Sequence, residues 1–319
     1  YQLAADAYRQ MIDLAAVPAL ELEARSQLAE IEARQGRLQE ARDQFAVLAR
    51  DFPETAIGER AALRIAELHQ EAGALAAARA AYDRFLSDYT NGARVASALY
   101  NRGLVAYQQY LFDEALADFE AVLSRFPDSA VAGDAAYMRV CGAFESYNDA
   151  RAVRLAREFL ANRPQSTWVP QVRFRLGEQA FNAGHYEEAE QEFEAVAAHE
   201  PRDASAGDAL FWAARAAAAR KQFQRAVGYD DRLVSQFPDH PKADEALYYQ
   251  GESLVELGDY PAALARFEAV VRRQPDTFLG FAARGRRGDC QFTLGAEDPA
   301  RFEEAIRSYR EIAEDPKAP

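Results

Sequence analysis

The sequence predicts an all-α protein, a right-handed α-α superhelix in which helix pairs stack into a solenoid. Three observations predict this fold class. Prolines recur at a 37-residue period, small and aromatic residues keep the same phase, and apolar residues recur at helical spacing on both sides of a turn. Because a stack of repeats grows in one dimension without a single core, the 319 residues do not imply two globular domains.

The prolines mark the end of each repeat. They occupy positions 53, 127, 164, 201, 238 and 275, and Thr90 stands where the period requires one more. A proline lacks an amide hydrogen and its ring clashes with the preceding turn, so it stops a helix. Each of these positions therefore predicts the end of the second helix of a pair.

Two further series predict how the helices pack. A small residue recurs at Ala29, Ala66, Gly103, Gly177, Ala214, Gly251 and Gly288, with Val140 as the exception. An aromatic residue recurs at Phe45, Tyr82, Phe119, Phe193 and Phe267, with Ala156 and Asp230 as the exceptions. Small residues allow two helices to cross closely, and we expect the rings to fill the space between neighbouring pairs.

Turn and cap residues predict where helices end and begin. Glycines at 36, 73, 184, 258 and 295 should end first helices, because glycine adopts the left-handed conformation at little cost. Two residues after the prolines stand side chains that can accept hydrogen bonds from the first free amides of a helix. These predicted N-caps are Thr55, Ser129, Ser166, Asp203 and Thr277.

Counting along this phase predicts a single solenoid over residues 1–319. A lone second helix over 1–16 precedes eight helix pairs. The pairs span about 18–53, 54–90, 91–127, 128–164, 165–201, 202–238, 239–275 and 276–316. Since the chain starts inside a repeat and without methionine, we expect an N-terminal part of the protein to be missing from it.

The unit from Ala246 to Pro275, with Gly251, Ala263 and Phe267 at the family's spacing, resembles the tetratricopeptide repeat, whose period is usually about 34 residues. Here three more residues separate the proline from the next helix. The phrases Phe-Pro-Asp-Ser (126–129) and Phe-Pro-Asp-His (237–240) are similar to a subgroup with this longer unit. That subgroup includes bacterial envelope proteins such as YbgF of the Tol–Pal system and BamD.

The resemblance implies that first helices form a concave wall that binds partner segments. Aromatic residues on that wall are Tyr100, Tyr137, Phe174, Phe211 and Tyr248, followed by a second row with Tyr107, Phe144, Phe181 and Phe292. Charged residues between them include Glu178, Arg215, Glu252 and Asp289. Such a trough suits an amphipathic helix or an extended peptide with basic and apolar side chains. The alternative is that these rings are scaffold, packing successive first helices together.

A cluster of arginines departs from the acidic background. It consists of Arg272, Arg273, Arg284, Arg286 and Arg287. One interpretation is a docking patch for an acidic partner. The other is that arginines near helix ends pair with local carboxylates.

Composition argues against other classes of function. The net charge of −14 repels the phosphates of nucleic acids, and no run of about 18 apolar residues could span a membrane. The four histidines, His69, His185, His199 and His240, lie in different repeats, without a histidine or cysteine partner at metal-ligand spacing. We therefore expect no catalytic residues, no metal and no cofactor.

The function expected from the resemblance is a non-catalytic scaffold for protein or peptide partners in a bacterial cell-envelope complex. It implies a place in the periplasm or at the outer membrane, with a lipid anchor upstream of this chain; the alternative location is the cytoplasm. A second hypothesis is a regulatory or substrate-recruiting part of an enzyme whose catalytic domain lies outside this chain. The oligomeric state stays open.

Overall fold

The computed structural model describes residues 2–14, 17–199 and 204–318. These residues form seventeen α-helices and no β-strand, so the all-α prediction is confirmed. The chain divides into two compact units, Tyr1–Ser166 and Thr167–Pro319, which we call unit 1 and unit 2.

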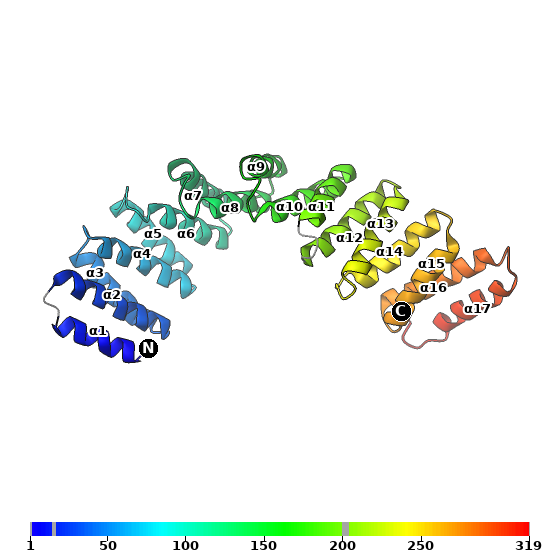
Figure 1. Ribbon diagram of the computed structural model, residues 1–319, viewed down its shortest axis with the longest axis horizontal. Coiled ribbons are helices and arrows are strands. Elements are labelled where there is room, and N and C mark those ends of the chain that lie inside the picture. Colours follow the sequence, from blue (N-terminus) through cyan, green and yellow to red (C-terminus); the bar gives the residue numbers. More distant parts are fainter. Residues whose placement is uncertain (1, 15–16, 200–203, 319) are drawn as a thin grey trace. The chain divides into compact units, whose positions relative to one another are not determined.

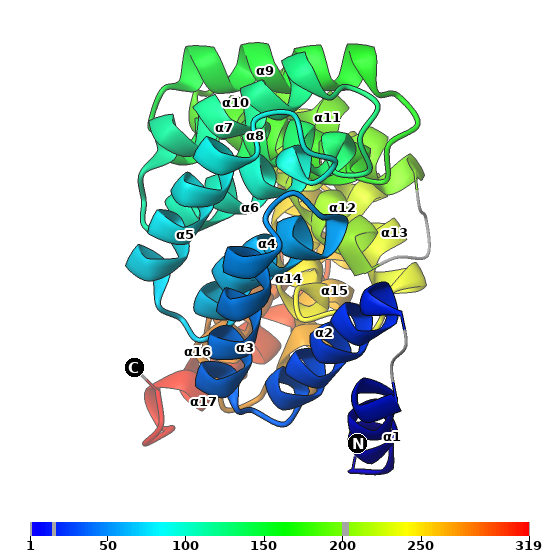
Figure 2. The same ribbon diagram turned by 90° about the vertical axis from the view of Figure 1, so that its left-hand side faces the viewer.

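Unit 1 contains a leading helix and four helix pairs (Figure 1). They are α1 (Gln2–Leu14), α2 (Pro18–Arg34), α3 (Leu38–Asp51), α4 (Ala56–Glu71), α5 (Leu75–Asp88), α6 (Val95–Gln108), α7 (Phe112–Arg125), α8 (Ala132–Glu145) and α9 (Asp149–Asn162). Each helix packs on the next, and the first helices α2, α4 and α6 also touch in sequence. Figure 2 turns the α2–α5 part of this stack toward the viewer.

Unit 2 contains four more pairs of the same design. They are α10 (Val169–Asn182), α11 (Tyr186–His199), α12 (Ala204–Ala219), α13 (Phe223–Gln236), α14 (Ala243–Glu256), α15 (Tyr260–Arg273), α16 (Phe278–Leu294) and α17 (Ala300–Ala313). The first helices α14 and α16 also contact each other directly, although α15 lies between them in the chain. This contact creates the surface on which the candidate site lies.

Second helices end in one repeated backbone geometry. The residue after the helix has φ between −136° and −132° and ψ between 46° and 60° at Phe52, Phe126, Arg163, Phe237 and Gln274. A following proline excludes the helical region for that residue. Tyr89, which precedes Thr90 instead, has φ −123° and ψ 71°. A similar turn therefore forms where threonine stands in place of the proline.

First helices end in the left-handed conformation at one fixed position of the period. Gly36, Gly73, Gly184 and Gly258 have φ between 70° and 82° there, as predicted. Gly295 ends α16 as predicted but has φ −60°, so only the expected left-handed conformation was wrong for this glycine. A side-chain carbon at 295 would lie 2.6 Å from the Phe302 ring. Glycine is needed there for space and not for a positive φ.

The N-cap prediction holds for only some of the helices. Thr55 and Thr277 cap α4 and α16, accepting hydrogen bonds from the amides of Gly58 and Gly280 at 3.1 and 3.2 Å. For Ser129 and Ser166 it was wrong, because α8 and α10 begin three residues later. Asp203 lies outside the described residues.

The glycines at positions 58 and 280 explain the difference. A side-chain carbon there would lie 1.9 and 1.8 Å from the carbonyl oxygens of Phe52 and Gln274. In α4 and α16, glycine lets the helix start two residues earlier against the preceding backbone. Helix α12 also starts there, at Ala204, with Ala206 in the glycine position. At the equivalent position, the helices α6, α8, α10 and α14 have Val95, Ala132, Val169 and Ala243, each of which is the first helical residue.

The core of each pair is a contact between a small residue and a ring. A side-chain carbon at Gly103, Gly177, Gly251 or Gly288 would come within 2.6–2.8 Å of an aromatic ring of the second helix. The rings are Phe119, Phe193, Phe267 and Tyr309. In the fourth pair the sizes are exchanged, since Val140 holds the small position and Ala156 the ring position, and both are buried.

Candidate partner-binding groove

The structure forms a groove of about 820 Å³ on unit 2, along α14 and α16. Three aromatic residues line it, Tyr248, Tyr249 and Phe278. Three acidic residues, Asp244, Glu245 and Glu252, line it too. Tyr248 and Glu252, both expected on a binding wall from the sequence, lie in this groove. Tyr249, Phe278, Asp244 and Glu245 are added by the structure.

Phe278 is the most exposed aromatic side chain of the groove, at 77%. It is the first residue of α16, within the extra turn that Gly280 allows. The equivalent position carries Ala56, Ala93, Ala130, Thr167, Ala204 and Pro241 in the other repeats. Comparing the repeats with one another would have marked this ring, because it is large where the others are small and it is not needed for packing.

Tyr248 and Tyr249 form the fixed wall of the groove. The Tyr248 ring packs edge-on against Phe267 at 5.6 Å and against Tyr249 at 5.5 Å, measured between ring centroids. Burial, followed by the charge of Glu252, raises the pKa of Tyr248 to about 12. The guanidinium of Arg215 lies 4.2 Å from the Tyr249 ring centroid. Both rings are thus held in place before any partner arrives.

The groove carboxylates are already paired. Asp244 lies 2.6 Å from the Arg273 guanidinium, as an ion pair, and Glu245 lies 3.1 Å from Lys242. Glu252 accepts from Arg286 through both oxygens, at 2.5 and 2.9 Å. The groove is therefore closer to neutral than its three carboxylates alone indicate. The Glu245 pair is the most open to solvent. Such exposed ion pairs stabilise a protein by only about 0–1 kcal/mol, so a basic side chain of a partner can replace Lys242 at little cost.

Three other expected groove residues of unit 2 make packing contacts. Phe174 packs against Phe193, with ring centroids 5.2 Å apart. Phe181 packs against both Tyr186 and Trp212, and Phe211 is only 4% exposed. Near them, burial raises the pKa of Glu178, whose cationic neighbour Arg175 lies 3.9 Å away. These contacts agree with the interpretation that the rings pack successive helices together.

Arg215 pairs with Asp230 inside the repeat. Its guanidinium donates to Asp230 at 2.6 Å, and the Asp230 side chain is fully buried. Burial raises the pKa of Asp230 to about 7, against the opposing effect of Arg215. Asp230 interrupts the aromatic series, so the sequence marked the position without indicating its partner. Arg215 reaches the groove only by supporting Tyr249.

In unit 1, the expected wall residues also pack into their repeats. Tyr100 packs against Phe119 at 5.9 Å, and burial raises its pKa. Tyr107 packs edge-on against Phe112 at 5.4 Å. Tyr137 and Phe144 are half-buried.

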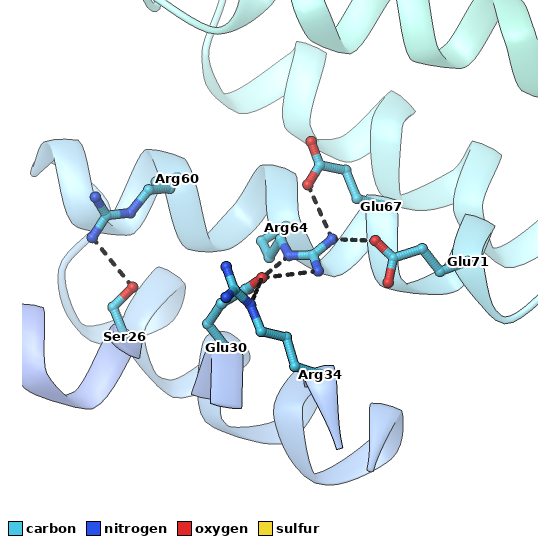
Figure 3. Close-up of polar contacts among 7 residues, drawn as sticks. All are labelled: Ser26, Glu30, Arg34, Arg60, Arg64, Glu67 and Glu71. Carbon is cyan, nitrogen blue, oxygen red and sulfur yellow. Dashed lines mark hydrogen bonds and ion pairs between the residues drawn. The ribbon is translucent and has the colours of Figure 1, made fainter. Parts of the chain in front are cut away.

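Ion pairs bridge the first helices α2 and α4 of unit 1, which sequence reasoning missed. Figure 3 shows Arg64 donating to Glu30 at 2.9 Å and to Glu71 at 2.6 Å. Glu30 and Arg64 occupy the same positions of the period as Glu252 and Arg286 in unit 2. The 34-residue spacing between glutamate and arginine, found twice, is the signal that could have identified this bridge.

Each of the five C-terminal arginines has an acidic neighbour. Arg272 lies 3.9 Å from Glu268, and Arg284 lies 3.1 Å from Asp315. Arg287 pairs with Glu311, while Arg273 and Arg286 pair with the groove carboxylates named above. Because these charges are matched locally, docking of an acidic partner stays a prediction without further support.

Comparison with known proteins decides the family. The profile of the YfiO family, described as outer membrane lipoprotein, matches residues 25–111, 94–174 and 169–278. Together these matches span residues 25–278, well over half of the chain. The chain belongs to the YfiO family. A tetratricopeptide repeat profile also matches residues 248–319.

Solved structures that resemble this YfiO-family chain are tetratricopeptide repeat proteins. The C-terminal part of one from Cytophaga hutchinsonii has a TM-score of 0.64 and 18% identity, and the match covers 81% of this chain and 98% of that one. One from Parabacteroides merdae has a TM-score of 0.50 and 18% identity, covering 78% and 91%. The predicted repeat superhelix is confirmed as the fold class. No curated protein matches the sequence.

Two absences hold for the part of the YfiO-family chain that the structure describes. Within it, no three histidine, cysteine, aspartate or glutamate residues are grouped so that they could hold a metal ion. None of the helices in the same ranges combines the length and the apolar character that crossing a membrane requires.

Proposed function

We propose that this protein is a non-catalytic scaffold of a bacterial cell-envelope complex and that the α14–α16 groove holds a segment of a partner protein. Membership of the YfiO family supports the envelope role, and the tetratricopeptide repeats support protein binding. The single observation that carries the groove assignment is Phe278, a 77% exposed ring in a preformed aromatic groove. Exposed aromatic residues in such places commonly dominate binding energy.

The chemistry of the groove indicates the kind of segment it holds. An apolar or aromatic side chain of the partner fits as an anchor between Phe278 and Tyr249. Its binding would remove water from that side chain and from both rings. A lysine or arginine beside the anchor can replace Lys242 at Glu245, whose side chain is 40% exposed. The partner segment is therefore apolar with at least one basic residue.

A crosslinking experiment in cells of the source bacterium tests this assignment. A photoreactive phenylalanine analogue replaces Phe278 in one variant and Ile306, which is 48% exposed on the second helix α17, in a control. We expect a crosslink to one envelope protein from position 278 alone. An equal yield from both positions, or a partner outside the envelope, would contradict the proposal.

The affinity of the captured partner segment then measures the role of the ring. We expect Phe278→Ala to weaken binding about 30-fold, corresponding to roughly 2 kcal/mol for a central aromatic anchor. The urea midpoint should stay unchanged, because the side chain is exposed. Isothermal titration with purified protein gives both the affinity and, by its heat capacity change, the apolar burial.

Cell fractionation tests the location separately. We expect the full-length protein to remain with the outer-membrane fraction or in the periplasm. Recovery of the intact protein in the cytoplasmic fraction would contradict the envelope assignment while leaving the groove assignment untouched.

A further inference from the structure

The position that ends each first helix carries an unusual choice of residues in unit 1. Gly36 and Gly73 hold the left-handed conformation there, but Tyr110 and Tyr147 hold it in the next two repeats, with φ of 61° and 55°. For a residue with a bulky side chain this conformation is disfavoured, because the Cβ atom crowds the neighbouring carbonyl oxygen. Glycine thus occupies this position in the first two repeats, and tyrosine occupies it in the next two.

Packing does not explain the two tyrosines. Their side chains are 81% and 94% exposed, so burial does not offset the backbone strain. Tyr110 makes one edge-on contact with Phe112, at 6.1 Å between centroids. Strain that packing does not repay is commonly kept for binding or catalysis.

The sequence segments that carry the two rings are acidic. The segments 108–114 and 145–149 carry Asp113, Glu114 and, beside Tyr147, Glu145 and Asp149, without a lysine or arginine. Two of these carboxylates contact arginines, yet Asp113 stays 85% exposed beside Arg151 and Glu114 stays 51% exposed beside Arg79. An exposed tyrosine face beside carboxylates attracts a cationic side chain and repels anionic surfaces.

We propose that Tyr110 and Tyr147 form a second binding edge, which takes an extended basic segment of a partner protein with arginine or lysine side chains over the two rings. Both rings occupy the same position in consecutive repeats, so a segment that contacts both has to run along the stack. This edge lies in unit 1 and shares no residue with the α14–α16 groove. It can therefore exist whether or not the groove assignment is correct.

Replacing both tyrosines by glycine in the full chain tests the first part of this inference. We expect the urea midpoint of the Tyr110→Gly/Tyr147→Gly variant to be equal to or above that of the wild type, because the strain is relieved. Lys221→Gly is the matched control, since Lys221 holds the same position in unit 2 with φ 59° and no ring. A clear fall in the midpoint of the tyrosine variant alone would make these rings structural and overturn the proposal.

Peptide binding tests the second part. The probe is a fluorescent 12-residue peptide of four Arg-Gly-Ser units, compared with one of four Glu-Gly-Ser units, by anisotropy at low salt. We expect the arginine peptide to bind the wild type and the Lys221→Gly control equally. The tyrosine variant should bind it about tenfold more weakly, as two exposed cation–π contacts imply.

Three results would overturn the binding edge. They are equal affinity of the wild type and the tyrosine variant, equal binding of the acidic peptide, and loss of binding in the Lys221→Gly control. Phe278→Ala should leave the affinity for the arginine peptide unchanged. If that variant alone weakens it, the basic peptide occupies the groove, and the edge is again contradicted.

Discussion

At Gly177 there is no room for a methyl group, because the position of its Cβ would lie 2.8 Å from the Phe193 ring. The same holds for the other glycine and ring pairs. Each ring packs directly on the glycine backbone, in the space that a side chain would occupy. The two series of small and aromatic residues in the sequence are one contact seen from both helices. The periods predicted both series, but the structure showed that each ring packs on the small residue of its own pair and not only between pairs.

Alanine at position 177 should therefore destabilise the protein by about 1–3 kcal/mol, since an overpacked core has to move the ring. Gly228 is the matched control, because a side-chain carbon there meets nothing within 4 Å. In the exposed interior of α13, Gly228→Ala should stabilise by about 0.5–1 kcal/mol. Urea unfolding followed by circular dichroism measures both, and equal effects at the two positions would contradict the packing argument.

The buried pair of Arg215 and Asp230 is the one place where a ring position carries a charge among the described repeats. Removing one partner leaves the other charge buried, so Arg215→Leu should destabilise by about 3–5 kcal/mol. The double variant Arg215→Leu/Asp230→Phe restores the ring opposite Ala214, as Phe45 stands opposite Ala29 in the first pair. We expect it to be as stable as the wild type or more so, because well-packed apolar residues often replace such pairs without loss.

The same pair gives a pH dependence with a definite sign. The pKa of Asp230 is about 7 when folded, above its ordinary value of about 3.9 in an unfolded chain. Between these values the folded state holds more protons, so its stability falls as the pH rises from about 4 to about 7. The difference in urea midpoint between the double variant and the wild type should widen over this range. A constant difference would contradict the folded pKa.

At the level of the helix, the start of α4 and of α16 depends on one glycine. Glycine at 58 and 280 permits a threonine-capped start two residues earlier, whereas Val95, Ala132, Val169 and Ala243 at the same position begin their helices. The sequence therefore allowed a correct N-cap at Thr55 and Thr277 but not at Ser129 or Ser166. The reason is that the cap depends on contact with the preceding backbone, which composition does not reveal.

Gly280→Ala should unwind the first turn of α16 and move Phe278 away from the groove. We expect faster amide hydrogen exchange at residues 278–281 and weaker binding of the partner segment, with the rest of unit 2 unaffected. Ala132→Gly in α8 is the control, since that helix already begins without the extra turn. Unchanged exchange in the Gly280→Ala variant would show that the backbone accommodates the methyl group.

The first-helix ends show a second limit of sequence reasoning. Glycine predicted the left-handed turn at Gly36, Gly73, Gly184 and Gly258, but Tyr110, Tyr147 and Lys221 adopt it without that signal. A conformation imposed by neighbouring repeats overrides the preference of the residue. Reading the 37-residue phase through the gaps in the glycine series would have identified these three positions.

For the whole molecule, the period makes a strong prediction about deletions. Removing residues 54–90 deletes one complete helix pair and keeps the following repeats in phase, because a repeat contacts only its neighbours. We expect this variant to retain its helicity per residue and to unfold cooperatively. Removing residues 56–71, which deletes α4 alone, should lower the helicity per residue at 222 nm, and equal values for the two deletions would contradict the repeat architecture.

The candidate site was less predictable than the fold. The resemblance to tetratricopeptide repeats pointed to first helices, and Tyr248 and Glu252 do line the α14–α16 groove. The expected rings Phe174, Phe181 and Phe211 instead pack against other rings, since the same spacing serves both roles. Phe278, the ring on which the proposed function depends, breaks the repeat pattern, and only its comparison with other repeats could have revealed it.

The exchanged sizes of Val140 and Ala156 constrain how such a chain can evolve. A recombination event that joined the helix carrying Val140 to the helix carrying Phe193 would set two bulky groups against each other. The reverse product, with Gly177 opposite Ala156, would leave an empty space. Viable duplications and crossovers therefore have breakpoints at the proline turns, so that the two helices of a pair are inherited together.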